Sequence, residues 1–214
     1  IPQVEGAGEP AVGRRAQHVL GVGPLGRAVV DPVQDVGVDV YVSAHLRDEV
    51  VLAVPTTLIG VEWVRDYPRP PAIAPVTRRV RVELAGELLA ESSRALRVLE
   101  TRHPPTVYLP PQDVRSQWLL TAEGRGSWCE FKGHAIYWSL NVDGRRSVKA
   151  AWCCPAPSHG FYDIAGYLAF FASCVDECWV DDERVQPQDG DFYGGWITSR
   201  TVGPFKGAPG TSGW

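Results

Sequence analysis

The residues with the richest chemistry gather between Trp128 and Trp152, in the stretch WCEFKGHAIYWSLNVDGRRSVKAAW. Aromatic side chains offer flat surfaces for a ligand, and nearby carboxylate and ammonium groups can orient it. From this stretch we predict a ligand-binding set made of Trp128, Cys129, Glu130, Lys132, Tyr137, Trp138 and Trp152. The alternative is that the aromatic residues, above all Trp138 and Trp152, only form the core between two sheets.

A thiol nucleophile is a second reading of the same stretch. Cys129 lies beside Glu130, and His134 or His103 could act as its base. Side chains alternate along a strand, which would place Cys129 and Glu130 on opposite faces of the sheet. The sequence therefore names no catalytic residue, and it does not decide whether the protein is an enzyme.

Metal and phosphate sites are not indicated. The spacing of the five cysteines does not match a four-thiolate zinc site, so we interpret them as buried structural thiols: Cys129, Cys153, Cys154, Cys174 and Cys178. The tail places Lys206 before Gly207, the wrong order for a phosphate-binding loop, and its prolines remove amide donors. We expect no metal, no zinc in particular, and no cofactor.

Turn signals within the stretch predict the strands that position these residues. Lys132-Gly133 and Asp143-Gly144 are typical of tight turns, and the second is a strong hairpin signal. Between and around them we expect three strands, at Ser127–Phe131, His134–Val142 and Arg145–Cys153.

Elsewhere the pattern also favours strands. Apolar and charged residues alternate over Arg79–Leu84, as in a half-buried strand. Further strands are expected at Leu88–Glu91, Ala95–Glu100, Val107–Leu109 and Leu168–Phe171, with a hairpin joining Cys178–Val180 to Val185. Prolines in its first turn predict one short helix near 111–120. The aromatic tail, Phe192–Trp214, is expected to be an ordered coil over the domain.

Composition limits the class of protein. The chain has 214 residues, 44% apolar, with net charge -4, so one folded domain is expected and nucleic-acid binding is not. We expect no membrane partner and a cytoplasmic location, because no apolar run approaches the ~20 residues of a membrane span. The sequence leaves the oligomeric state open.

Composition changes near residue 60. Residues 1–60 contain a single aromatic residue, Tyr41, and offer little to bury. This extension is uncertain: an accessory β-element is one reading, and a disordered or wrongly extended N-terminus is the favoured one. The folded domain is expected over residues 61–214, and deletion of residues 1–60 should leave it folded.

Several segments resemble one known family. They are DYPRPP (66–71), LRVLET (96–101), HPP (103–105), YLPPQDV (108–114), CEFKG (129–133), VDECWV (175–180), GGWIT (194–198) and GPFKG (203–207). Together they resemble, in the same order and over about residues 63–214, the domain-of-unknown-function 427 family, which also carries a nucleotidyltransferase label. The resemblance implies a mainly β fold of the β-tent type, in which two antiparallel sheets meet at an angle around a cradle.

We therefore predict a β-tent domain that binds a small molecule of unknown identity, with no demonstrated reaction. The alternative is an enzyme that acts through Cys129 or on a nucleotide. The nucleotide reading follows from the family label only, because no visible motif supports it.

Overall fold

The structure, a computed structural model, describes residues 60–190 and 192–211. The predicted extension, apart from Gly60, and Trp214 of the tail lie outside these residues. Within them the fold is mainly β, as predicted, and its helical parts are five short 3-10 turns. No helix in this part of the chain is long and apolar enough to cross a membrane.

The larger sheet has eight strands, and all its paired neighbours run antiparallel. Its order is β2 (Ala72–Pro75), β5 (Leu96–Leu99), β6 (Thr106–Leu109), β11 (Leu168–Phe170), β10 (Arg145–Cys153), β9 (Gly133–Val142) and β7 (Leu119–Thr121). The eighth strand, β8 (Ser127–Cys129), pairs with the first residues of β9, so β7 and β8 share one edge of that strand.

The predicted double hairpin forms the centre of this sheet. Asp143 and Gly144 both adopt positive φ angles, 48° and 89°, as a two-residue type I′ turn requires. Strand β8 ends at Cys129, two residues earlier than predicted, because residues 130–132 form the turn before Gly133, whose φ is 85°. Farther along, the β9/β10 pairing is irregular between Ser147 and Ala151.

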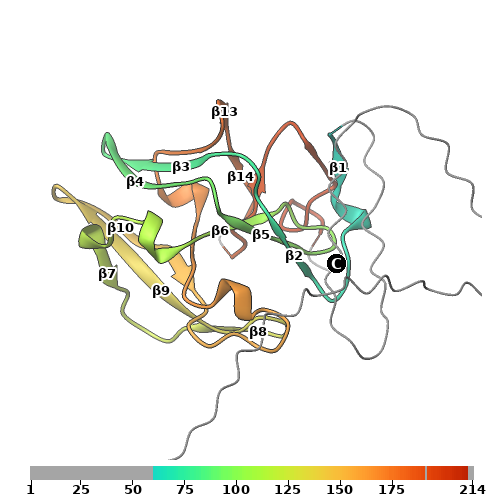
Figure 1. Ribbon diagram of the computed structural model, residues 1–214, viewed down its shortest axis with the longest axis horizontal. Coiled ribbons are helices and arrows are strands. Elements are labelled where there is room, and N and C mark those ends of the chain that lie inside the picture. Colours follow the sequence, from blue (N-terminus) through green and yellow to red (C-terminus); the bar gives the residue numbers. More distant parts are fainter. Residues whose placement is uncertain (1–59, 191, 212–214) are drawn as a thin grey trace, which may run out of the picture. The chain divides into compact units, whose positions relative to one another are not determined.

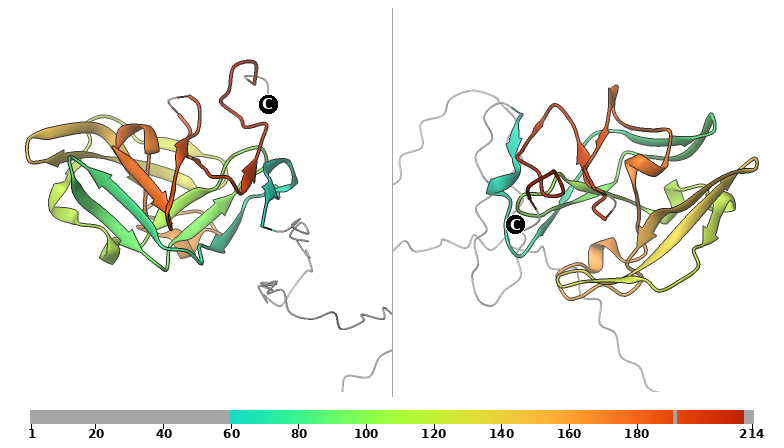
Figure 2. Two further views of the ribbon diagram at one scale, coloured as in Figure 1. Left: turned by 90° about the horizontal axis from the view of Figure 1, so that it is seen from above. Right: turned by 180° about the vertical axis from the view of Figure 1, so that it is seen from behind.

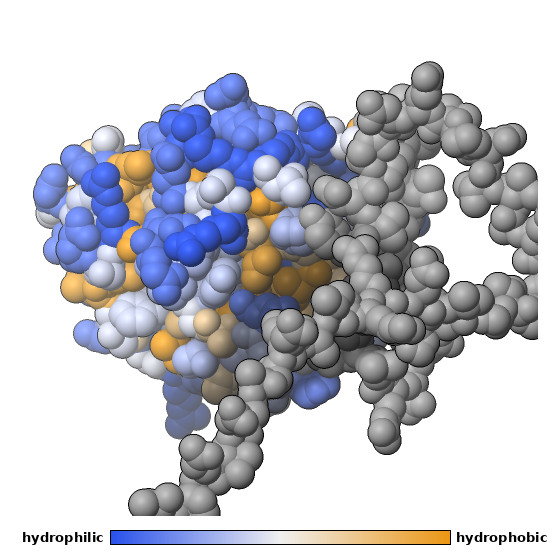
Figure 3. Space-filling model, in the orientation of Figure 1, coloured by the Kyte–Doolittle hydropathy of each residue, from blue (hydrophilic) through white to orange (hydrophobic). Residues whose placement is uncertain are grey.

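The smaller sheet has four strands, in the order β13 (Glu183–Arg184), β12 (Glu177–Val180), β3 (Val80–Leu84) and β4 (Glu87–Ser92). The predicted alternation is confirmed on β3, where Val80 and Val82 are fully buried. The intervening Arg81 and Glu83 form an ion pair at 3.4 Å. Figure 3 shows hydrophilic residues gathered over β3 and β13.

Two further sheets have two strands each. Strands β1 (Glu62–Trp63) and β16 (Thr201–Val202) run parallel, whereas β14 (Gln186–Pro187) and β15 (Trp196–Ile197) run antiparallel. The aromatic tail is ordered where it is described: Trp196 is 2% exposed, and its indole N–H donates to the carbonyl of Phe170 at 3.1 Å. Phe192, in contrast, remains 65% exposed.

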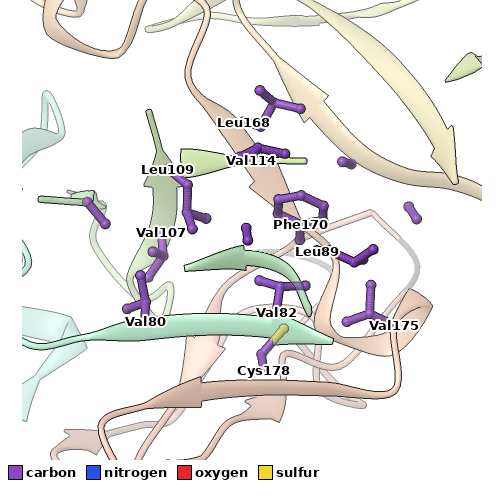
Figure 4. Packing of buried hydrophobic residues seen from close by; sticks show 14 of the residues in the cluster. Val80, Val82, Leu89, Val107, Leu109, Val114, Leu168, Phe170, Val175 and Cys178 are labelled. Carbon is purple, nitrogen blue, oxygen red and sulfur yellow. The ribbon is translucent and has the colours of Figure 1, made fainter. Parts of the chain in front are cut away.

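The main core lies between the two large sheets. The β3/β4 and β9/β10 hairpins point to the same side of the molecule and are inclined to one another (Figures 1 and 2). Between the sheets, Val82 and Cys178 of the smaller sheet lie in one apolar cluster with Leu109 and Phe170 of the larger one (Figure 4). Alternate residues of the same central strands, among them Tyr108 and Trp152, form a second buried cluster. The eight-stranded sheet therefore carries apolar residues on both faces.

The short helix expected near 111–120 is replaced by two 3-10 turns, Pro111–Asp113 and Ser116–Trp118. Between them Val114 is extended, with φ −113° and ψ 132°, and it forms a β-bridge with Ala90. The next N–H, of Arg115, donates to the carbonyl of Leu89 at 2.8 Å. Pairing with β4 interrupts the helix despite the favourable prolines. The other 3-10 turns are Val64–Asp66, Tyr162–Ile164 and Ala172–Cys174.

Candidate functional site

A cavity of about 240 Å³ lies on the face of the eight-stranded sheet that points away from the smaller sheet. Six of the seven residues predicted to bind a ligand line it: Trp128, Cys129, Glu130, Lys132, Tyr137 and Trp152. The seventh, Trp138, does not. Because Tyr137 and Trp138 are neighbours on β9, they point to opposite faces, and Trp138 packs against the core between the sheets.

The floor of the cavity is aromatic. Tyr108 on β6 is 0% exposed, and Trp152 on β10 and Phe171 after β11 are each 9% exposed. The Trp152 and Phe171 ring centres lie 4.4 Å apart. The Trp152 N–H donates to the Tyr108 hydroxyl at 3.3 Å, so that hydroxyl keeps its own hydrogen to donate. The floor is thus apolar over most of its area, with few polar groups.

The C-terminal segment closes one side of the cavity through Gly194. A Cβ atom added there would lie 2.2 Å from Cη2 and 2.7 Å from Cζ3 of Trp152. Glycine is therefore required for close approach of this backbone to the indole. At the rim, Trp128 and Phe192 are 71% and 65% exposed and could contact a bound ligand from outside.

A cluster of charges lines another wall. The Lys132 ammonium lies 3.3 Å from Glu100 Oε2, and Nδ1 of His103 lies 3.8 Å from Glu100 Oε1. All three side chains are mostly buried, with 14%, 21% and 11% of their areas exposed for Lys132, Glu100 and His103. A charge in such a position requires a partner, and Lys132 and Glu100 are partners of each other.

The tautomer of His103 follows from its contacts. Its Nδ1 lies 3.0 Å from the Thr101 carbonyl, which can only accept a hydrogen bond, so Nδ1 carries the hydrogen. Burial lowers the pKa of His103 below its usual range, which favours the neutral ring. Nε2 is then an acceptor, and among the described residues it has no hydrogen-bond partner.

Glu130 is paired with a residue that the sequence did not single out. Its Oε1 accepts from Arg69 Nη2 at 2.6 Å. Arg69 also lies over the Phe131 ring, 5.0 Å from its centre. Both members of the pair are exposed, and Glu130 reaches the cavity because it lies in the turn after β8, where strand alternation does not apply.

Lys206 is held beside this wall by the backbone. Its N–H donates to the carbonyl of Arg102 at 2.8 Å, and its own carbonyl accepts from the Gln188 side chain at 2.6 Å. The Oε1 of Gln188, which is 4% exposed, accepts from the N–H of Gly195 at 3.0 Å. One buried amide therefore joins the segments that carry Gly194 and Lys206.

The five cysteines have different surroundings. Three are buried, and we call them the buried thiols: Cys153, Cys154 and Cys178. Burial raises the pKa of Cys154 to about 11 and that of Cys178 still further. Cys129 is partly exposed and lines the cavity together with His103, but no hydrogen bond joins it to a histidine in the described part of the chain. Nor does any group of three or more potential metal ligands occur within residues 60–190 and 192–211.

A second hollow, of about 460 Å³, lies beside β12, β13 and β14 and has no aromatic lining residue. Its charged residues pair within the protein: Asp176 with Arg145, and Glu177 with Arg184 at 3.7 Å. The aromatic cavity is the better candidate for a ligand site, although it is the smaller of the two.

Several cavity residues were not predicted as site residues, namely Glu100, Tyr108, Phe171, Gly194 and Lys206. Four of them lie within the segments that carry the family resemblance, and Phe171 is the exception. The signal was therefore present in those motifs. Nothing local to each motif indicated that they meet around one cavity.

The family model described as "Domain of unknown function (DUF427)", with the label NTP_transf_9, matches residues 72–181. The matched part includes the cavity floor and Glu100, His103 and Lys132, whereas the segment with Gly194 and Lys206 follows it. No curated protein matches the chain.

Proposed function

The chain belongs to the DUF427 family, and from the cavity in its eight-stranded sheet we propose that it is a small-molecule-binding domain. The proposal rests mainly on one observation: one cavity, with an aromatic floor and a charged wall, is enclosed by residues that are distant in sequence. These residues come from β6, β8, β10 and the C-terminal segment. Apolar surfaces with a few oriented polar groups are the usual composition of ligand sites.

Trp152 and Trp138 offer a matched test of this proposal. They lie on neighbouring strands of one sheet, but Trp152 lines the cavity and Trp138 packs on the opposite face. We expect that Trp152→Phe weakens ligand binding, because it removes part of the stacking surface. Trp138→Phe should lower stability and leave binding unchanged, because its indole contacts the core.

The experiment is a thermal-shift screen of a metabolite library with the full chain and both variants. A ligand at a hundred times its dissociation constant adds about 2.7 kcal/mol of stability. At roughly 2–4 °C per kcal/mol, the melting temperature should rise by roughly 5–10 °C. A hit that Trp152→Phe abolishes and Trp138→Phe preserves supports the proposal. A library without hits, or hits lost equally in both variants, would count against it.

The family label suggests a nucleotide, and the partly exposed Cys129 suggests a nucleophile. Neither suggestion has a specific contact behind it: Cys129 has no histidine hydrogen bond among the described residues, and the prolines at 204 and 209 interrupt the amides near Lys206. We therefore propose binding without assigning a reaction.

A further inference from the structure

The carboxylates of the cavity are already neutralised by the protein. Glu100 pairs with Lys132 at 3.3 Å, and Glu130 pairs with Arg69 at 2.6 Å. A cationic ligand would have to compete with these ammonium and guanidinium groups for its counter-ion. The acidic residues of the cavity thus give no reason for it to select a cation.

Lys206 differs from the other charged residues that line the cavity. In the described part of the chain no carboxylate lies within ion-pair distance of its ammonium group, whose neighbour is the Tyr193 ring, 5.7 Å away. The side chain is half-buried, and its backbone is fixed by hydrogen bonds to Arg102 and Gln188. A partly buried cation that has no counter-ion among the described residues is favourable for an incoming anion.

Lys206 adds a positive charge to the charged wall. Burial is the largest cause of the lowered pKa of His103, and the ammonium groups of Lys206 and Lys132 lower it further, so both act on the same neutral ring. Lys132 is paired with Glu100, the one mostly buried carboxylate that lines the cavity in the described part of the chain. The charge of Lys206 therefore has no counter-charge among the described residues next to the aromatic floor.

We propose that the cavity binds a small aromatic anion, with its ring against Trp152 and Phe171 and its charged group at Lys206; this rests on the proposed function. A volume of about 240 Å³ suits one ring with a short substituent. The anionic group can be a carboxylate or a phosphate monoester, since both accept charge-assisted hydrogen bonds from an ammonium group.

The test compares probes of one shape and different charge. Benzoate, benzamide and benzylamine are titrated into the full chain by calorimetry, and phenyl phosphate serves as the phosphate probe. We expect benzoate or phenyl phosphate to bind. The anionic probe should bind at least roughly tenfold more tightly than its neutral counterpart (benzamide or phenol), the ratio expected of one charged hydrogen bond. Binding of benzoate alone indicates a carboxylate ligand, and binding of phenyl phosphate alone indicates a phosphate ligand.

Lys206→Gln should remove the preference for the anion and leave the affinity for the neutral probe unchanged. Lys149→Gln is the matched control, because Lys149 also lies 5.7 Å from a tyrosine ring, that of Tyr137, but does not line the cavity. If Lys206→Gln fails to fold, salt provides a second measurement: added salt should weaken anion binding by the wild type more than neutral binding.

Equal affinity for benzoate, benzamide and benzylamine would overturn the inference, as would equal effects of the two lysine variants. If the library screen finds ligands that depend on Trp152 but neither anionic probe binds, only the anion preference is refuted. If the screen finds no ligand at all, the proposed function itself fails, and the inference with it.

Discussion

Replacing Gly194 by alanine should move the Trp152 indole out of its place in the cavity floor. The new methyl group would lie 2.2 Å from Cη2, and these atoms must separate by about 1.2 Å to reach an ordinary contact of 3.4 Å. The φ angle of Gly194 is not in the left-handed region, so the backbone itself tolerates alanine. The cost therefore comes from crowding, which in a packed site is about 1–3 kcal/mol.

A double-mutant cycle with Trp152→Phe isolates this contact. The atoms in conflict belong to the six-membered ring of the indole, which phenylalanine does not place there, although Phe171 at 3.2 Å still limits the space. Gly194→Ala should cost about 1–3 kcal/mol in the wild type and at least about 0.5 kcal/mol less in the Trp152→Phe background. Chemical denaturation gives the four unfolding free energies, and each kcal/mol corresponds to roughly 2–4 °C in melting temperature. Equal costs in both backgrounds would show that the methyl group does not meet the indole.

The remaining predictions use other contacts. Glu62→Gln should lower the free energy of unfolding by about 1–3 kcal/mol, because Glu62 accepts three hydrogen bonds from mostly buried groups. Glu130→Gln, at an exposed pair, should change it by less than about 1 kcal/mol, and denaturant melts compare the two. Burial lowers the pKa of His103 in the folded state, so the free energy of unfolding should fall as the pH drops below about 6.5, where the unfolded chain takes up the proton first. His103→Gln should flatten this part of the plot of unfolding free energy against pH. A plot parallel to that of the wild type would refute the role of burial. In a native thiol titration, Cys129 should react faster than the three buried thiols, and a cavity ligand should slow it; equal rates would contradict the observed burial.

Local signals predicted most of the strands. Asp143-Gly144 marked the β9/β10 hairpin through its turn geometry, and the alternation from Arg79 to Leu84 marked β3. The helix near 111–120 was mispredicted because the proline signal is local, whereas the β-bridge between Val114 and Ala90 joins residues far apart in sequence. Propensity gives way to tertiary contacts of this kind.

Local signals also explain which of the residues that line the cavity were singled out from the sequence. Residues near the turn after β8 could be grouped because they are close in sequence. Trp138 was grouped with these residues by mistake. Its neighbour Tyr137 faces the cavity, and because side chains alternate along a strand, Trp138 must face the opposite side of the sheet. Gly194 and Lys206 lie more than 40 residues beyond Trp152, and no local pattern states that such segments meet.

Strand β10 also limits how this protein can evolve. Ala151 and Cys153 face the inter-sheet core, while Trp152 and Cys154 face the cavity, so an insertion of one residue would exchange the two sets. A lineage under selection for a new ligand has little freedom along this strand. The turn at 130–132 and residues 192–193 border the cavity without belonging to that core. Divergence in ligand preference should therefore accumulate in these two loops, around a floor that changes slowly.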